Sequence, residues 1–253
     1  MFVELATTLK PSTLSQIRNV LASALREAEM PEMIPRSPLD KLRSKRGQKR
    51  PLPIGPSPVA KPADKSTIDH KIAGLPVGDP RRMALYLART LGRRRGEVCG
   101  VRWRDAEPSK ITAREQIVPV GKTAITKAPK YDSEREIKIG RKVAQALQQH
   151  RLALAEQLLA CRVRLTDDHS ICAWPDGRPL RPGSSAGWCG RRGFRLHDVR
   201  HLNASVLLST EPLPIVAQRL GHSRPEVTLC TCAHVLPGQD DRAAEAIDEA
   251  LGV

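Results

Sequence analysis

Aromatic residues are scarce in this chain: phenylalanine, tryptophan and tyrosine together make up 3% of its 253 residues. Proteins that bind single-stranded nucleic acid stack the bases on aromatic side chains, so this mode of binding is not expected. The chain also has no run of about 18 apolar residues, and we expect no membrane-spanning helix. No basic region precedes an apolar stretch at the N-terminus, so a signal peptide is not expected either.

Acidic residues are in deficit. The chain has 27 of them against 42 lysines and arginines, which gives a formal net charge of +15 and an isoelectric point near 10.1. This balance favours a polyanionic partner, with nucleic acid first and an anionic membrane surface second. Because aromatics are few, duplex DNA bound through its phosphates fits better than a single strand. A small-molecule substrate is not expected.

The six cysteines include no C-x-x-C pair. A disulfide framework is typical of short secreted chains, so we expect free thiols in a reducing cytoplasm, and no metal or other cofactor. Cys230, Cys232 and His234 come nearest to a zinc-ligand set. Their alternate spacing on a helix would place them on different faces, and no second ligand pair is evident.

The first 78 residues divide into two predicted segments. Residues 1–40 contain an amphipathic helix over 12–29, with Ser12 or Thr13 as its N-cap. Residues 41–78 are predicted to form a basic, proline-rich linker. Its basic residues form either a solvated run of charge or a contact with DNA phosphates: Lys41, Arg43, Lys45, Arg46, Lys49 and Arg50.

Residues 79–253 are predicted to form one domain that is mainly α with a small antiparallel β-sheet, an α+β fold. A helix is expected over 83–90, strands within 111–120 and 123–139, and a second helix over 141–163. The expected buried side of that second helix consists of Val143, Leu147, Leu152, Leu154 and Leu158. The last sixty residues are predicted to be helical.

The densest group of chemically capable residues lies between 196 and 235. His197 and Arg200 are three residues apart, so on a helix they share a face and can converge on one anion. Pro214 suits the first turn of a following helix, and Gly221 suits its C-terminal cap. His222 would then stand just beyond a helix end.

Another helix is predicted to start directly after His222. Ser223 and Glu226 have the spacing of a capping box. Cys232 lies about two turns into that helix.

The order and spacing of these motifs resemble those of the tyrosine recombinases, the phage-integrase family. The family's H-x-x-R, L-G-H and T-x-x-T-Y-A-H are similar to His197–Arg200, Leu220–His222 and Thr228–His234. Its T-G-L-R-R-G-E is similar to Leu91–Glu97 and selects Arg94, and its P-P-K-T is similar to 128–131 and selects Lys130. The resemblance also implies that the first helix is the last part of a core-binding domain whose earlier helices are missing.

The resemblance implies a role for each matched residue. Arg94 and Arg200 would hold the scissile phosphate, because guanidinium groups match phosphate oxygens. His222 would add a hydrogen bond to it, and Lys130 would protonate the leaving 5′ oxygen. The remaining two act on protons and position: His197 would help to move the proton of the nucleophile, and Glu97 would orient its neighbours.

The nucleophile position departs from the family, because Cys232 stands where the motif has tyrosine. The only tyrosines are Tyr86 and Tyr131, and neither occupies the motif. The Cys232 sulfur would lie several ångströms closer to the backbone than a phenolic oxygen, and a misplacement of about 1 Å can cost a hundredfold in rate. We therefore expect no efficient DNA cleavage.

Three interpretations stay open at this point. The chain is a degenerate remnant of an integrase, a catalytically inactive duplex-DNA-binding protein with a regulatory or accessory role, or an active cysteine-dependent recombinase. All three place it in the cytoplasm, associated with the nucleoid, and derive it from a phage or mobile element. A helix over 240–251 is expected either to mediate a homo-oligomer on DNA or to pack on its own domain.

Overall fold

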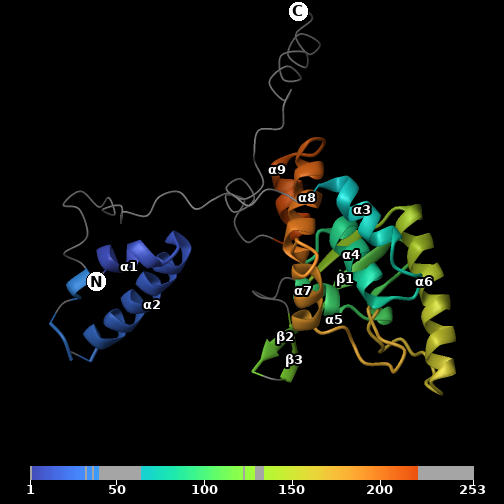
Figure 1. Ribbon diagram of the computed structural model, residues 1–253, viewed down its shortest axis with the longest axis horizontal. Helices are drawn as coiled ribbons and strands as arrows, with labels where there is room; N and C mark the ends of the chain where they lie inside the picture. The colour runs from blue at the N-terminus through green and yellow to red at the C-terminus, as the bar shows by residue number, and fades with distance from the viewer. Residues whose placement is uncertain are drawn as a thin grey trace, which may run out of the picture. The chain divides into compact units, whose positions relative to one another are not determined.

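The computed structural model describes residues 2–31, 33–35, 37–39, 64–121, 123–128 and 134–221. The chain divides into two compact units, residues 1–60 and 61–253, and each is considered separately (Figure 1). Mainly helical structure with a small amount of antiparallel strand confirms the predicted fold class. Within the described part of the chain, no helix is both long and apolar enough to cross a membrane.

The first unit contains a short helix α1 (Phe2–Thr8) and the predicted amphipathic helix α2 (Pro11–Glu29). The predicted N-cap at Ser12 or Thr13 is wrong, because the helix is capped two or three residues earlier. Lys10 is the N-cap, and Pro11 takes the first helical position, where its missing N–H is not needed.

The second unit begins with helix α3 (Lys65–Ala73), inside the segment expected to be a linker. The Asp64 carboxylate accepts a hydrogen bond from the Thr67 amide at 3.0 Å and so caps this helix. Ile68 and Ile72 are buried in the core of the unit. The folded unit therefore starts before residue 79, and the expected linker residues 41–63 lie outside the described part of the chain.

Helix α4 (Pro80–Leu91) runs through the middle of the second unit and packs against α3, α5 (Arg95–Gly100) and α8 (Leu196–Leu208). Gly92 ends it with φ +62°, in the left-handed region that favours glycine. A short 3₁₀ helix, η2 (Trp103–Asp105), follows α5.

The strands form two separate antiparallel pairs. β1 (Lys110–Ala113) pairs with β4 (Arg135–Lys138), and β2 (Gln116–Val120) pairs with β3 (Thr123–Lys127) in a hairpin. Ile111 pairs with Ile137 in the first sheet, and both are buried.

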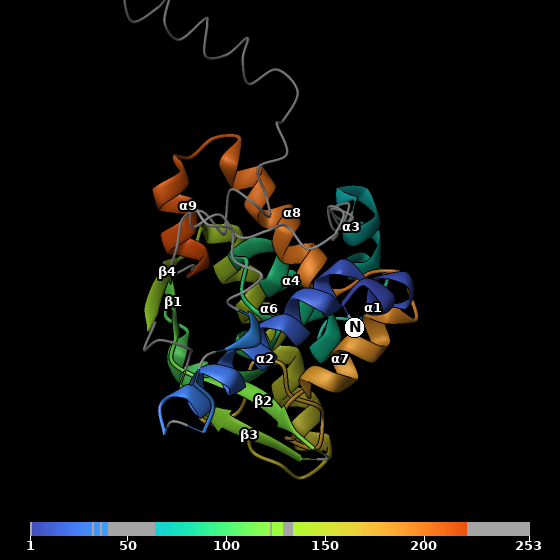
Figure 2. The same cartoon turned by 90° about the vertical axis from the view of Figure 1, so that its left-hand side faces the viewer.

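In the second unit, α7, α8 and α9 lie on one side of α4 and α5 and the long helix α6 lies on the other, as Figure 1 shows; Figure 2 gives the view turned by 90°. Their bounds are α6, Arg141–Ala160; α7, Pro182–Gly190; α8, as above; and α9, Leu213–Leu220. Leu147, Leu154 and Leu158 on α6 are buried as predicted, and Val143 is half-buried. Leu152 is 62% exposed, so its predicted burial is wrong: two residues from Leu154, it points to the opposite side of the helix.

Candidate phosphate-binding site

Helix α8 positions the two residues that the H-x-x-R spacing selected. Asp198 accepts a hydrogen bond from the Arg195 amide at 2.8 Å and forms a capping box with Arg195, which fixes the start of the helix. Arg200, one turn later, is 2% exposed, whereas His197 keeps an exposed edge. The two therefore share one side of the helix at different depths.

The buried guanidinium of Arg200 connects two helix ends. Its Nη1 donates to the Gly92 carbonyl at 2.6 Å, and its Nη2 donates to the Leu220 carbonyl at 2.8 Å. Carbonyls at the C-terminal ends of helices carry partial negative charge, so the cation is favourably placed there. Arg200 thereby holds the ends of α4 and α9 together.

Arg94 lies at the start of α5 and reaches the same end of α9. Its Nη1 is 3.0 Å from Oε1 of Glu97, and its Nη2 donates to the Gly221 carbonyl. The side chain is 36% exposed, so the guanidinium also has access to solvent. Because it has five N–H groups, donors remain for an external anion.

Glu97 is the buried carboxylate between two arginines. Its Oε2 lies 2.7 Å from Nη2 of Arg135, whose Nε donates to the Arg219 carbonyl at 3.2 Å. Burial alone would raise the pKa of Glu97, but the positive charges of Arg135, Arg94 and Arg93 outweigh it and leave the pKa below its ordinary value. The carboxylate is therefore ionised at neutral pH and orients both guanidinium groups.

Two glycines let these groups approach one another. Gly221 has φ +69°, and a Cβ placed there would lie 2.6 Å from Nη1 of Arg135. A Cβ on Gly92 would lie 2.4 Å from Oδ1 of Asn203. The prediction that Gly221 caps the helix containing Pro214 is confirmed. At this cap the Gly221 backbone lies against the guanidinium groups of Arg94 and Arg135.

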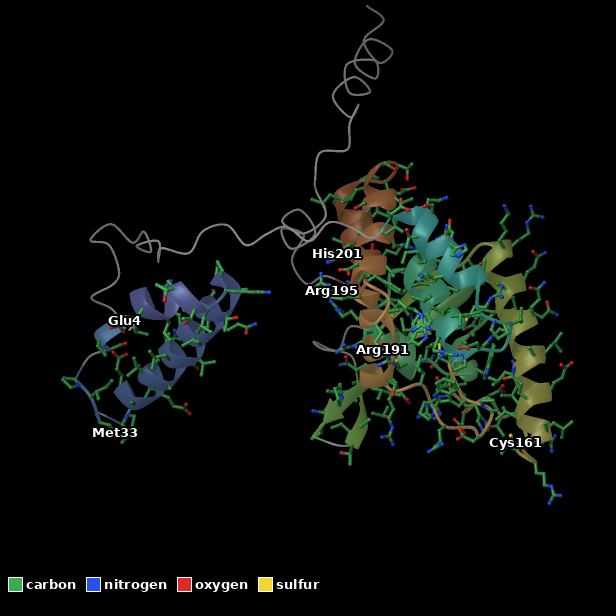
Figure 3. All side chains as sticks on the ribbon, viewed as in Figure 1. Glu4, Met33, Cys161, Arg191, Arg195 and His201 are labelled. Atoms are coloured by element: carbon green, nitrogen blue, oxygen red, sulfur yellow. The ribbon has the colours of Figure 1, made fainter. Side chains whose placement is uncertain are left out.

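His197 and His201 form an imidazole pair on α8, with ring centroids 4.4 Å apart. Partial burial, followed by the neighbouring His201 and Arg200, lowers the pKa of His197 to about 4. His197 is therefore neutral at physiological pH and able to accept a proton. Figure 3 shows that His201, Arg195 and Arg191 lie along one edge of the second unit.

Arg93 is an arginine in the hydrophobic core. It is 1% exposed, and none of its three side-chain nitrogens has a hydrogen-bond partner within the described residues. Burial lowers its pKa to about 10, so it still carries its charge at neutral pH. The family motif T-G-L-R-R-G-E has leucine at this position, so Arg93 departs from the motif.

Several expected site residues fall outside the described part of the chain. These are Lys130, His222, Cys232, the capping box of Ser223 and Glu226, the helix over 240–251 and the six basic residues between 41 and 50. Of the predicted chemical residues, the structure therefore brings together Arg94, Glu97 and Arg200, with His197 on the same helix as Arg200.

Sequence reasoning missed Arg135 and the burial of Arg93. Arg135 lies 38 residues from Glu97 and is one of 42 basic residues, so nothing in its local pattern distinguishes it. Arg93 lies in a run of three arginines, which suggests a solvated surface. A hydrophobic position in the family motif was the one available signal for its burial.

The described residues contain no cluster of three or more metal-ligating side chains. Cys230, Cys232 and His234 lie outside them. The described cysteines are free thiols, and burial raises the pKa of Cys99 to about 12 and that of Cys189 to about 11. These two thiols are therefore protonated and poorly nucleophilic at neutral pH.

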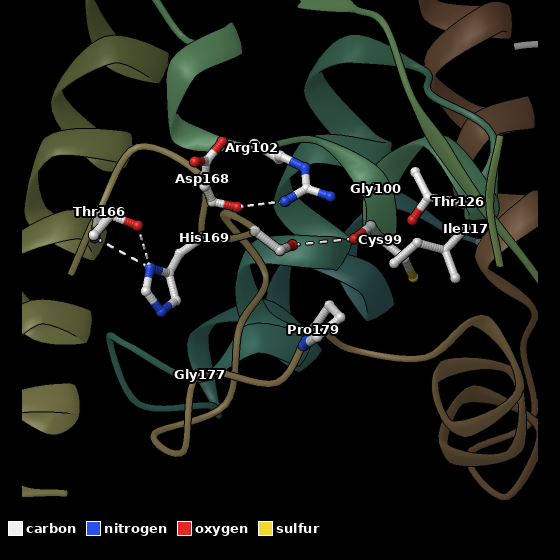
Figure 4. A pocket seen from close by; sticks show the side chains of 11 residues that line it. Cys99, Gly100, Arg102, Ile117, Thr126, Thr166, Asp168, His169, Gly177 and Pro179 are labelled. Atoms are coloured by element: carbon white, nitrogen blue, oxygen red, sulfur yellow. Dashed lines mark hydrogen bonds between the residues drawn. The ribbon is translucent and has the colours of Figure 1, made fainter. Parts of the chain in front are cut away.

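A separate pocket of about 320 Å³ lies between α5, β2, β3 and the loop after α6 (Figure 4). Its polar groups bond to one another: Arg102 donates to the Asp168 carbonyl at 2.7 Å, and the Thr166 amide donates to Nδ1 of His169 at 3.1 Å. It contains none of the predicted site residues.

The chain matches no protein-family model and no curated protein. Among solved structures, the integrase of transposon Tn1549 in complex with transposon right end DNA superposes with a TM-score of 0.71 and 20% identity, over 98% of this chain and 81% of that one. A lambda integrase dimer bound to a COC′ core site superposes with a TM-score of 0.60 and 17% identity, over 90% of this chain and 75% of that one. XerA recombinase superposes with a TM-score of 0.53 and 15% identity, over 96% of this chain and 83% of that one. The chain therefore has the fold of these integrases and recombinases.

Proposed function

We propose that this chain is a tyrosine recombinase by descent, of the phage-integrase type that carries out site-specific DNA recombination and integration. One observation carries the proposal. Within an integrase fold, Arg94 and Arg200 meet at the Leu220–Gly221 carbonyls and are held there by Glu97 and by main-chain acceptors. The meeting point immediately precedes His222 of the L-G-H motif.

The charge balance of the site supports a phosphate ligand. Arg93, Arg94 and Arg135 lie around the ionised carboxylate of Glu97, and Arg200 lies at the adjoining ends of α4 and α9, so these residues together carry an excess of positive charge. Fixed guanidinium groups stabilise an anion more strongly than mobile ones, because they need no reorganisation. In this proposal Arg94 and Arg200 bind the scissile phosphate and Glu97 positions Arg94.

The proton-transfer roles follow from the same assignment. His197, neutral at physiological pH, is assigned to help move the proton of the attacking group. Lys130 is assigned to protonate the leaving 5′ oxygen and His222 to bind the phosphate. No step requires a metal ion or a nucleotide, since a covalent phosphoenzyme conserves the energy of the broken bond.

We propose further that the chain is a degenerate member that lacks a working nucleophile. Cys232 stands at the tyrosine position, and a short thiol does not reach a phosphate held for a phenolic oxygen. The buried Arg93 supports degeneracy, because its guanidinium makes no hydrogen bond within the described residues, and a buried charge without hydrogen bonds destabilises the core that it occupies. The alternative is a catalytically inactive DNA-binding protein with an accessory role. Such a protein would bind DNA phosphates with the same arginines, and its DNA binding would itself be the retained function.

The remaining assignments belong to the same proposal. Residues 1–40 belong to a core-binding segment, the basic residues between 41 and 50 lie along DNA, and the protein associates with the nucleoid. The helix over 240–251 mediates a homo-oligomer on DNA. Deleting residues 239–253 then lowers the oligomeric state on DNA, whereas an unchanged state would mean that this segment packs on its own domain.

The binding part of the proposal is tested by titrating the full-length protein with labelled duplex DNA at several salt concentrations. Tight binding that weakens steeply with salt is expected, because phosphate contacts release counterions. Vesicles of anionic lipid serve as the competing polyanion. Preferential binding to vesicles, or DNA binding that scarcely changes with salt, would contradict the proposal.

A further inference from the structure

Two adjoining hollows lie beside the candidate site, and Arg95 lines both. One, of about 380 Å³, includes Pro182 of α7 and reaches Lys127 at the end of β3; the other, of about 370 Å³, includes Ala186 of α7 and reaches His197. Pro182 and Ala186 are four residues apart and share one face of the helix. The hollows therefore follow each other along α7, and together we call them the Arg95 groove.

The lining of the Arg95 groove is positively charged and contains no carboxylate. Lys127 stands in one hollow, Arg195 in the other, and Arg95 between them. Within the described residues, the exposed Arg95 side chain makes no hydrogen bond or ion pair. The Arg195 guanidinium is oriented by Asp198, which accepts from its Nε at 3.1 Å and its Nη2 at 2.7 Å.

The lining also offers contact surface between the charges. Ala128, Pro182 and Ala186 contribute small or apolar surface beside the cations. A single small anion would need only one hollow. A groove with cations at both ends and at the middle instead matches a polymer that carries a negative charge at every unit.

We propose that the Arg95 groove binds the sugar–phosphate backbone of the DNA strand adjacent to the scissile phosphate, with Arg95 as its central contact. This inference rests on the proposed function and adds residues to which the recombinase motif assigns no role. Arg195 holds the strand on the His197 side of Arg95. Lys127 holds it on the other side, toward the β2–β3 hairpin.

The test measures duplex binding and its salt dependence for the full-length wild type and for Arg95→Ala, Arg195→Ala and Lys127→Ala. Arg164→Ala is the matched control: it removes the same charge from an exposed residue that lines neither hollow. Each groove variant is expected to bind about fivefold more weakly and to lower the slope of log K against log salt by about 1. The control should change affinity by less than about twofold and leave the slope unchanged.

The double variant Arg95→Ala/Arg195→Ala should lose about two from the slope, since the two side chains contact different phosphates. Thermal unfolding of each variant shows whether it is folded. If the wild type binds duplex DNA with a steep salt slope but Arg95→Ala behaves like Arg164→Ala, the groove assignment is wrong and the proposed function stands. If the wild type itself lacks salt-dependent binding, both fail.

Discussion

Arg135 and Glu97 form an ion pair at 2.7 Å in which both side chains are almost fully buried, with exposed fractions of 9% and 1%. Arg135 begins β4, Glu97 lies in α5, and Arg135 also donates to the Arg219 carbonyl at the end of α9. The pair therefore connects three elements at the point where Arg94 is oriented. Its integrity should matter for stability as well as for phosphate binding.

Replacing Arg135 by alanine should destabilise the protein by about 3 kcal/mol, because it leaves the Glu97 charge buried with less compensation. Urea unfolding monitored by circular dichroism measures the loss. Arg104→Ala removes an exposed arginine that pairs with Glu115 at 2.6 Å, and it should cost much less stability because solvent screens this pair. Equal losses in the two variants would show that the buried pair contributes no more than a surface pair.

The stabilising effect of Glu97 should disappear in acid. Since the pKa of Glu97 is lowered in the folded protein, its contribution is present above the unfolded carboxyl pKa, about 4.3, and is lost as pH falls through the lower folded value. Wild type and Glu97→Gln should therefore differ most in unfolding free energy above about pH 5, and the difference should shrink as pH falls below the unfolded carboxyl pKa. A difference that stays constant from pH 3 to pH 7 would contradict this assignment.

Removing the buried charge of Arg93 should stabilise the fold. Methionine has a similar length and no charge, so Arg93→Met should raise the free energy of unfolding by about 2 kcal/mol. Thermal and urea unfolding report the gain. Arg94→Met, which loses the bonds to Glu97 and to the Gly221 carbonyl, should show no gain. A loss of stability in Arg93→Met would mean that the guanidinium has partners that stabilise it.

Alanine at Gly221 should be costly on two grounds. Its φ of +69° disfavours any residue with a Cβ, and that Cβ would meet the Arg135 guanidinium at 2.6 Å. A loss of about 1–3 kcal/mol is expected, together with weaker DNA binding. Gly183→Ala is the control, because that helical position has open space and alanine should stabilise it slightly. Equal changes in stability and in DNA affinity for the two variants would contradict the role assigned to Gly221.

The sequence predicted those parts of the fold that depend on local spacing. The periodicity of α2 and α6, the αL cap at Gly221 and the three-residue spacing of His197 and Arg200 are properties of single helices. The predicted start of the folded domain was wrong because Ile68 and Ile72 lie in a segment that is polar and proline-rich as a whole. Their burial depends on packing against α4, which is a tertiary property.

The sequence named candidate site residues but could not predict the contacts that they make. Arg94, Glu97 and Arg200 followed from a resemblance between motifs. Their partners did not, since Arg135 and the carbonyls of Gly92 and Leu220 come together only when distant segments fold. Main-chain acceptors have no signature in sequence, because every residue has a carbonyl.

The central claim is that an integrase-type site persists in this chain without a working nucleophile. The most direct measurement is denaturing electrophoresis of the full-length protein after incubation with nicked duplex DNA that carries several candidate sites. We expect no covalent adduct with the wild type, and we expect any adduct formed by Cys232→Tyr to be lost when Arg94→Ala is added. A wild-type adduct that disappears in Cys232→Ala would contradict the account and establish Cys232 as the nucleophile of an active recombinase.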